Sequence, residues 1–321
     1  MQKRNRSLDL AFTLAAAVLT ALLAAPAGST PIDWRLVSNP TVSNTKDDTG
    51  YGAVDYAYAI AAHETTNAQY AEFLNAVASK EDLHGLYSHR MNLDWRGGIV
   101  RQGTVGAFSY SVKAGRGNNP VNYVSFFDAL RFTNWLNNGQ GGADTEVGAY
   151  TLNGSNPGGV LRNEGAQIFL TSEDEWYKAA FFDPISASFM DYAGGGGAPT
   201  CGLPGVPGAT ANCDTPGHNG LVAVGSYGNP TSFGTFDQGG NVWEITEASS
   251  AGGRIMRGGS MVNAASWESS LKRIRIDEDA EDYAVGFRVG GMVPYVPEPG
   301  TALLVGVGLL VLGVRRNRER A

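Results

Sequence analysis

Three short segments in the last third of the chain decide its fold: Gly240-Asn241-Val242-Trp243-Glu244, Arg257-Gly258-Gly259-Ser260 and Gly286-Phe287-Arg288. Each places glycine beside aromatic or charged side chains. Trp243 is expected to pack in the core, as Trp135, Trp176 and Trp267 are. Arg257 and Arg288 are expected to be buried in ion pairs or on backbone carbonyls, with Glu64 and Glu175 as candidate partners.

The composition around these segments favours an irregular fold. The chain has 43 glycines, and only 17% of its residues are charged. We expect one domain over residues 31–295, of α+β class with much irregular coil. Capping residues and apolar periodicity predict helices that start near Thr66, Ser125 and Ser172. The expected helices cover residues 66–78, 125–137 and 172–183, and the expected strands residues 56–61, 167–170, 254–257 and 286–289.

The first 27 residues have the pattern of a secretory signal peptide. Lys3, Arg4 and Arg6 precede an apolar run over residues 11–25, and Ala25-Pro26-Ala27 forms a cleavage site of small residues. An uncleaved anchor is the alternative, but the run is shorter than the ~20 residues that span a bilayer. The pattern therefore predicts export.

The last segment, residues 296–321, consists of a short proline motif, an apolar stretch and a cluster of arginines, in this order. Val296-Pro297-Glu298-Pro299 precedes an uncharged apolar stretch, and arginines beginning at Arg315 and Arg316 follow it. This tail resembles the PEP-CTERM sorting signals of Gram-negative bacteria. The resemblance implies processing by an exosortase, a transient inner-membrane anchor, and delivery to the cell surface or extracellular matrix. A plain single-span anchor is the alternative.

The charge between these ends is strongly negative. The segments 1–27 and 300–321 carry net charges of +2 and +3, so the body carries −12, against −7 for the whole chain. Such a body repels nucleic acid and anionic lipid, and it is suited to divalent cations or neutral sugars. Nucleic acid is therefore not an expected partner.

The two cysteines of the chain, Cys201 and Cys213, flank a loop rich in glycine and proline. In an oxidising compartment a disulfide between them is expected. A redox or copper pair is the alternative, but the loop has no neighbouring histidine or basic residue that would lower a thiol pKa.

Six motifs in order resemble the formylglycine-generating enzyme, or sulfatase-modifying factor, family. The resemblance extends over nearly the whole body and implies that family's variant of the C-type lectin fold. The motifs are His63-Glu64-Thr65-Thr66-Asn67-Ala68-Gln69-Tyr70, Asn119-Pro120-Val121-Asn122-Tyr123-Val124-Ser125, Leu170-Thr171-Ser172-Glu173-Asp174-Glu175-Trp176, and the three segments quoted first.

The resemblance does not carry the family's oxidase activity with it. The oxidases use a cysteine pair just after the Arg-Gly-Gly-Ser motif to bind copper, and Cu(I) requires soft thiolate ligands. Asn263 and Glu268 occupy those two positions here. We therefore expect no copper and no formylglycine generation.

A structural calcium site is the one metal site that the resemblance suggests. Gly240, Asn241, Val242 and Glu244 offer side-chain and carbonyl oxygens of the kind that Ca²⁺ binds. The alternative is that Asn241 and Glu244 only satisfy a buried turn, and the sequence leaves both open.

These observations favour a non-catalytic binding module for an exopolysaccharide, another surface glycan or another matrix component. An enzyme of the same fold with a different site, either a metal-dependent oxidoreductase or a sugar-modifying enzyme, is the second hypothesis. A structural matrix protein without a specific ligand is the third.

Overall fold

The computed structural model describes residues 31–38 and 48–293. The expected signal peptide and the expected sorting tail lie outside these residues. Within the part that the structure describes, no helix combines the length and the apolar character needed to cross a membrane.

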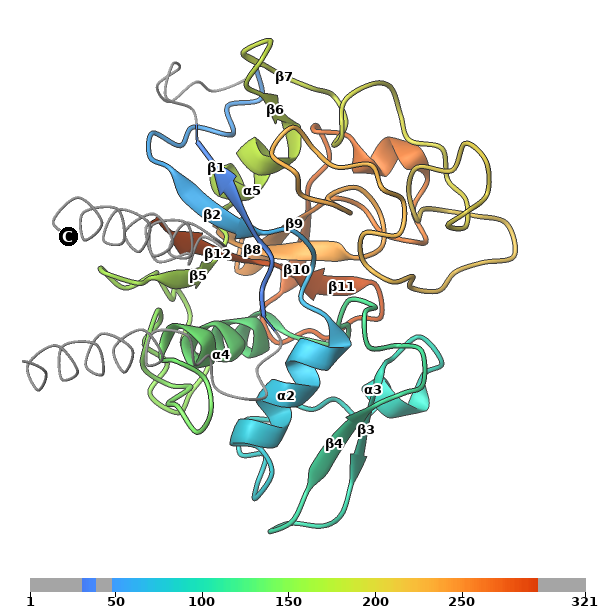
Figure 1. The fold of residues 1–321 in the computed structure, drawn as a ribbon. Helices are drawn as coiled ribbons and strands as arrows, with labels where there is room; N and C mark the ends of the chain where they lie inside the picture. The colour runs from blue at the N-terminus through green and yellow to red at the C-terminus, as the bar shows by residue number, and fades with distance from the viewer. Residues whose placement is uncertain (1–30, 39–47, 294–321) are drawn as a thin grey trace, which may run out of the picture. The chain divides into compact units, whose positions relative to one another are not determined.

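Two four-stranded sheets form the framework (Figure 1). The first is antiparallel throughout, whereas in the second β11 runs parallel to β8. The strand order of the first sheet is β1 (Trp34–Val37), β2 (Tyr58–Ala61), β12 (Val289–Met292) and β5 (Ile168–Leu170). That of the second is β10 (Ile274–Asp277), β9 (Gly253–Arg257), β8 (Trp243–Ser250) and β11 (Val285–Phe287).

The chain passes from one sheet to the other at Arg288. Strand β11 ends at Phe287, and β12 begins at Val289. The single strand expected over residues 286–289 is therefore wrong, because its two halves pair in different sheets. Strand β8 also departs from expectation. After Ile245 it carries Thr246, Glu247, Ala248 and two serines, so its sequence has no apolar alternation that predicts a strand.

The three expected helices are confirmed, and each begins with a capping box. These are α2 (Asn67–Val77), α4 (Phe126–Asn137) and α5 (Glu173–Phe181), capped by the side chains of Thr66, Ser125 and Ser172. Each cap satisfies backbone N–H groups that the first helical turn leaves free. The remaining elements are α3 (Arg90–Leu93), the 3₁₀ helix η1 (Ala265–Glu268), and the hairpins β3 (Ile99–Gln102)–β4 (Ser109–Val112) and β6 (Phe182–Asp183)–β7 (Ser188–Phe189).

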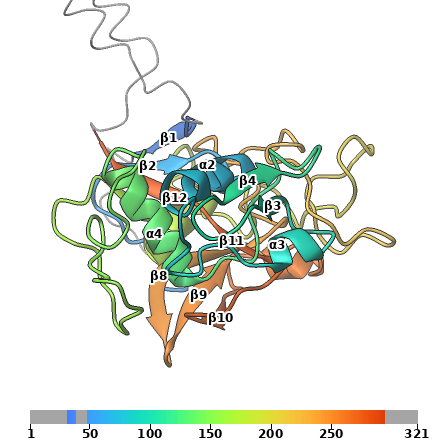
Figure 2. The same ribbon diagram turned by 90° about the horizontal axis from the view of Figure 1, so that it is seen from below.

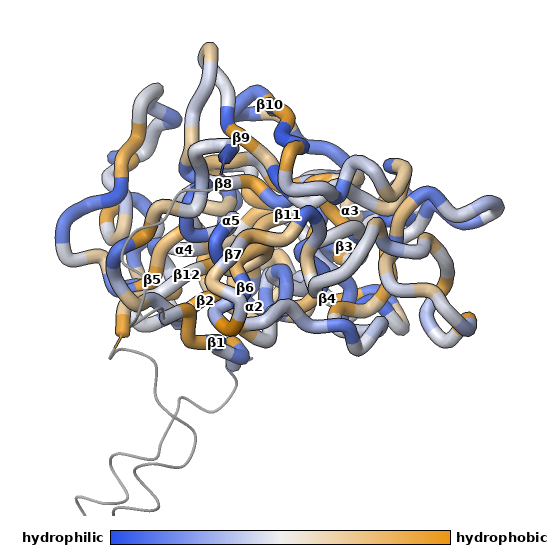
Figure 3. The backbone as a smooth tube through the Cα atoms, turned by 90° about the horizontal axis from the view of Figure 1, so that it is seen from above, coloured by the Kyte–Doolittle hydropathy of each residue, from blue (hydrophilic) through white to orange (hydrophobic). Residues whose placement is uncertain are grey.

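Aromatic side chains join α2, α4 and the second sheet into the main core. The ring of Phe132 lies 5.4 Å from those of both Phe73 and Phe287, and Trp135 lies 5.4 Å from Phe73. Helices α2 and α4 accordingly lie beside each other (Figure 2). The hydropathy colouring follows this packing, with apolar residues along buried strands such as β2 and polar residues along outer loops (Figure 3).

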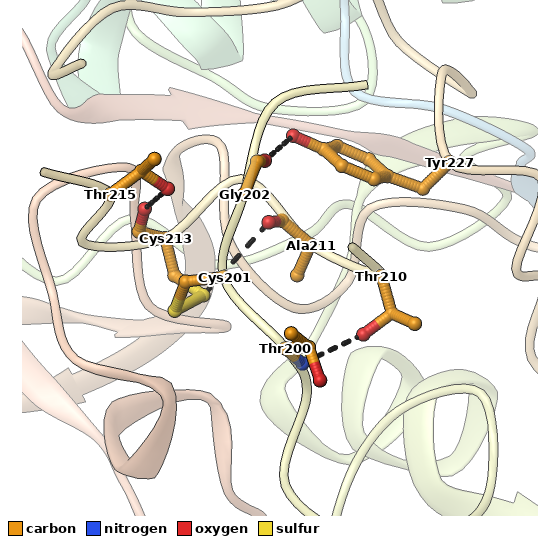
Figure 4. The surroundings of a disulfide bond; sticks show 8 residues. All are labelled: Thr200, Cys201, Gly202, Thr210, Ala211, Cys213, Thr215 and Tyr227. Carbon is orange, nitrogen blue, oxygen red and sulfur yellow. Dashed lines mark hydrogen bonds between the residues drawn. A yellow bond between two sulfur atoms is a disulfide. The ribbon is translucent and has the colours of Figure 1, made fainter. Parts of the chain in front are cut away.

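The expected disulfide between Cys201 and Cys213 is present (Figure 4). Further contacts fix the loop that it closes. The hydroxyl of Tyr227 donates to the Gly202 carbonyl at 2.8 Å, and the Thr200 amide donates to the Thr210 hydroxyl at 2.9 Å. Backbone hydrogen bonds also join its two ends, from the Gly202 amide to the Ala211 carbonyl and from the Thr210 amide to the Thr200 carbonyl, so the disulfide closes a glycine- and proline-rich loop that is already paired at its base.

Replacing both Cys201 and Cys213 by serine should lower the free energy of unfolding by about 2–4 kcal/mol, since the crosslink restricts the unfolded chain. Urea denaturation with and without reductant measures this. Reductant should destabilise the natural chain and leave the double variant unchanged. Two free thiols in the unreduced native protein would contradict the prediction.

Candidate ligand-binding site

A buried ion pair lies at the junction of the two sheets. Arg288 Nε and Nη2 donate to the two carboxylate oxygens of Glu244 at 2.5 and 2.6 Å, and both side chains are fully buried. The indole Nε1 of Trp176 donates to the same carboxylate at 2.7 Å. Arg288 also donates to the carbonyls of Ala61 and Ala62 at the end of β2. One guanidinium therefore joins β8 to β2.

The turn at 240–244 does not fit a calcium ion bound by Glu244. Its carboxylate already accepts from Arg288 and Trp176, and a divalent cation there would be repelled by the guanidinium. Asn241 Oδ1 accepts from the Asn212 side chain and the Val222 amide. Across residues 31–38 and 48–293, no three His, Cys, Asp or Glu side chains gather to hold a metal ion. The geometry supports the interpretation that Asn241 and Glu244 satisfy a buried turn.

The expected partners of the motif arginines are wrong, although both arginines are buried and paired. Arg257 Nε donates to Glu173 at 2.8 Å and its Nη1 to the Ser270 carbonyl at 2.7 Å. Glu175 caps the start of α5 and pairs with Arg162. The capping box and Arg162 therefore use the carboxylate that was a candidate partner for a motif arginine.

Glu64 pairs with neither motif arginine. Both of its carboxylate oxygens are buried without a hydrogen-bond partner. Burial raises the pKa of Glu64 well above its ordinary value, although the charge of Arg288 opposes this shift. The carboxylate of Glu244 pairs with Arg288 in place of Glu64 or Glu175, the two candidate partners expected from the sequence.

The two positions that the family resemblance predicts to correspond to the oxidases' cysteines, Asn263 and Glu268, differ in their surroundings. Asn263 is partly exposed, and its Oδ1 accepts from the Ser260 hydroxyl at 2.7 Å. Glu268 ends the 3₁₀ helix η1 and is 2% exposed. Its neighbour Trp267 is 38% exposed, so its expected place in the core is wrong. The short helix turns Glu268 inward and leaves Trp267 at the surface.

Motif glycines make room for the Glu268 side chain. A Cβ atom at Gly239 would lie 3.0 Å from Glu268 Oε2, one at Gly240 would lie 3.1 Å from Oε1, and one at Gly259 would lie 3.0 Å from Cγ. Gly240 and Gly259 also have φ of +90° and +75°, which side chains with Cβ rarely adopt. The Gly-Asn and Arg-Gly-Gly-Ser segments thus cradle the carboxyl that stands at a cysteine position.

Glu268 lines a small, partly enclosed pocket of about 30 Å³, with Tyr192, Tyr227, Phe236 and Asp237 among its other walls. Burial raises the pKa of Glu268 well above its ordinary value and that of Asp237 to about 6. Burial and the charges of both carboxylates raise the pKa of the Tyr227 hydroxyl. Shifted carboxyl groups in a pocket are typical of functional sites.

An open groove of about 370 Å³ lies beside α3. Its walls come from three parts of the chain: Arg90, Leu93, Asp94, Arg96, Tyr123, Asp282 and Tyr283. Arg96 is held by two hydrogen bonds to Asp94, at 2.9 Å from Nε and 2.8 Å from Nη2. Its guanidinium lies 3.8 Å from the centre of the Tyr283 ring and 5.6 Å from that of Trp95, which is 54% exposed. The pairing holds the pKa of Asp94 well below its usual range.

Comparison with known proteins agrees with these motifs. A model of the sulfatase-modifying factor enzyme 1-like domain matches residues 51–290. The chain belongs to this family. The fold expected from the six motifs, a formylglycine-generating-enzyme fold of mixed helices and strands with much coil, is therefore confirmed.

Solved structures show the same fold at low sequence identity. Treponema denticola variable protein 1 is 18% identical and aligns over 84% of this chain and 98% of its own, with a TM-score of 0.56. CarF is 19% identical over 82% of this chain and 99% of its own, with a TM-score of 0.53. None of the curated proteins is significantly similar in sequence. At these identities the likeness shows the fold alone.

The tail of this family member carries a second match. A model of the PEP-CTERM protein-sorting motif matches residues 296–318, which includes Val296-Pro297-Glu298-Pro299, Arg315 and Arg316. This protein is therefore an exported member of the family, and an exosortase is its processing partner.

Sequence reasoning located Glu268 but missed most of its surroundings. Asp237 and Tyr227 stand in coil outside the motifs, and only folding brings them to the Glu268 pocket. Asp94-Trp95-Arg96, a tryptophan between opposite charges, is a local sequence pattern that could have pointed to the groove. Tyr123 and Tyr283, which also line it, are 160 residues apart in the chain, so the sequence could not show that they lie beside Asp94 and Arg96.

Replacing Glu244 by glutamine should lower the free energy of unfolding by about 3–5 kcal/mol, because it leaves the buried Arg288 guanidinium without its counter-charge. Urea denaturation measures the loss. Asp33→Asn provides the control. Asp33 pairs with Arg35 at the surface, so its loss should cost about 1 kcal/mol or less.

The same variant separates the two interpretations of the 240–244 turn. If the ion pair alone satisfies Glu244, a calcium chelator leaves the melting temperature of the natural protein unchanged. A chelator-induced fall in melting temperature that Glu244→Gln abolishes would restore the calcium site.

Proposed function

We propose that this protein is a non-catalytic binding module that recognises a neutral glycan of the cell surface or extracellular matrix. The observation that carries the proposal is the open groove beside α3, lined by Leu93, Tyr283 and the Asp94–Arg96 pair. Trp95, which is 54% exposed, stands between Asp94 and Arg96 in the chain, and the Arg96 guanidinium lies 5.6 Å from the centre of its ring. Its volume of about 370 Å³ lies within the range of ~300–1,000 Å³ typical of small-ligand sites.

The walls of the groove suit the two faces of a sugar. Sugar rings have apolar C–H faces, which stack on aromatic rings, and polar edges, which need paired donors and acceptors. Trp95 and Leu93 offer exposed apolar surface, at 54% and 81% exposure. The Asp94 carboxylate and the Arg96 guanidinium offer an acceptor and a donor side by side. This combination favours a carbohydrate over a wholly apolar ligand.

The Asp94–Arg96 pair in the groove is fixed before any ligand binds. Two hydrogen bonds to Asp94 hold the Arg96 guanidinium in plane, and Tyr283 stacks on it. Tyr123, in the groove wall, has φ of 57°, a conformation that residues other than glycine seldom adopt. Binding to such a surface loses little side-chain entropy.

The net charge of the body restricts the class of glycan that could bind. Between the two end segments the protein carries −12, so anionic polysaccharides would be repelled at low ionic strength. A neutral glycan is not repelled. The same charge argues against nucleic acid as a partner.

The residues at the family's cysteine positions support binding over oxidation. Asn263 and Glu268 cannot supply the two thiolates that Cu(I) requires. Cys201 and Cys213 are joined in a disulfide and offer no thiolate either. We therefore derive no copper-dependent step for this protein.

The sorting motif supports a surface or matrix location for the proposed binding. Processing by the exosortase would release the body from a transient anchor in the inner membrane and deliver it to the surface or matrix. A module that holds a matrix glycan is useful in that location.

Glycan arrays and polysaccharide pull-downs with the processed body test the proposal. Trp95→Ala should weaken binding to the selected glycan at least tenfold, equivalent to about 1.4 kcal/mol, because it removes the stacking surface. Isothermal titration calorimetry with that glycan measures the change.

Ile185→Ala is the matched control. Ile185 is 94% exposed and lies in the β6–β7 turn, far from α3 (Figure 1), so its loss should leave affinity unchanged. No binding by folded protein across the array would overturn the proposed function. Equal affinity of Trp95→Ala and the natural protein would remove the groove as its site.

A further inference from the structure

We propose that the pocket around Glu268 binds a primary ammonium group, independently of the glycan groove. The observation behind this is a buried carboxylate oxygen that accepts no hydrogen bond from the part of the chain that the structure describes. Glu268 is 2% exposed, lines the pocket, and its Oε1 has no hydrogen-bond partner among the described residues. A buried acceptor left without a donor costs ~1–3 kcal/mol, and more when it is charged. A ligand that supplies N–H donors at this atom would recover that cost.

The carboxyl is held in place rather than left to adapt. The backbones of Gly239, Gly240 and Gly259 pass so close to it that a Cβ at any of them would come within 3.0–3.1 Å. The absence of side chains at these three glycines leaves the space that the Glu268 carboxyl occupies, and alanine at any of them would crowd it. The arrangement keeps Glu268 directed into the pocket.

The size of the pocket selects the ligand group. About 30 Å³ is room for one water-sized group. An –NH₃⁺ group is of this size, whereas a sugar ring or a cation with its water shell is larger. Calcium would also need six to eight oxygen ligands. Among the described residues, no third acidic, histidine or cysteine side chain joins Glu268 and Asp237 in a group that could hold a metal ion.

The other walls suit a positive charge. Tyr192, Tyr227 and Phe236 line the pocket, and aromatic faces attract ammonium groups. The ring of Tyr227 is fixed by its hydroxyl, which donates to the Gly202 carbonyl at 2.8 Å. Asp237 adds a second carboxylate, with one oxygen bonded to the Gly225 amide. The pocket thus joins two acidic groups to three aromatic rings.

Hexosamines with a free amino group and lysine side chains both carry a primary ammonium group. The pocket accommodates only the ammonium group itself. The rest of either ligand would stay outside, so the pocket alone does not choose between them.

Isothermal titration calorimetry of the full processed body with propylammonium tests the inference. We expect saturable binding of propylammonium and none of 1-propanol, which has similar size without the charge. Glu268→Gln keeps the shape of the side chain and removes its charge, and it should weaken binding at least tenfold. Glu81→Gln, which removes a carboxylate from an exposed position, should leave binding unchanged.

Ligand size gives a test that needs no variant. Tetramethylammonium carries the same charge but exceeds the pocket, so it should bind at least tenfold more weakly than propylammonium. Equal binding of the two cations, or equal binding by Glu268→Gln and the natural protein, would overturn the inference. So would the absence of propylammonium binding.

Titrations with glucosamine, N-acetylglucosamine and Nα-acetyl-lysine amide then separate the sources. Binding of glucosamine without N-acetylglucosamine supports an amino sugar, and binding of the lysine derivative supports a protein ligand. The outcome is independent of the groove, because Trp95→Ala should leave propylammonium binding unchanged.

Discussion

The guanidinium of Arg288 lies at the junction of two sheets, shielded from water and paired with the equally buried carboxylate of Glu244. Removing two charges from water is costly unless each finds its partners. Arg288 meets this requirement with two bonds to Glu244 and others to the carbonyls of Ala61, Ala62 and Phe236. These groups come from distant parts of the chain, so the pair is satisfied only when both sheets have formed. The indole of Trp176 ties α5 to the same carboxylate.

This junction also determines what the neighbouring turn can do. With Glu244 committed to Arg288, the Gly-Asn-Val-Trp-Glu segment acts as scaffold, and its glycines leave space for a different carboxyl, that of Glu268. Glu268 is one of the two positions that the family resemblance predicts to correspond to the oxidases' cysteines. In this protein that position holds a buried carboxyl in an enclosed pocket.

The groove beside α3 and the Glu268 pocket differ in kind. The groove is open, and its guanidinium is held by Asp94 and stacked on Tyr283, so its polar groups already have partners and can add further ones at the surface. The pocket is small, and the Glu268 oxygen within it lacks a partner. The first suits an extended polar ligand that keeps much of its hydration. The second suits one compact charged group.

The sequence by itself determined the family, the C-terminal sorting signal, the disulfide and the three capped helices. These features depend on local order: a capping serine three residues before an acid, two cysteines around a loop, or a Pro-Glu-Pro before an apolar stretch. It could not determine the ion-pair partners, the split of the last strand between two sheets, or the exposure of Trp267. Only the tertiary structure decided that Arg288 pairs with Glu244, and that Glu268 meets Asp237 and Tyr227. Partners separated by tens or hundreds of residues are selected by packing and by the cost of burying a charge, and neither appears in local sequence.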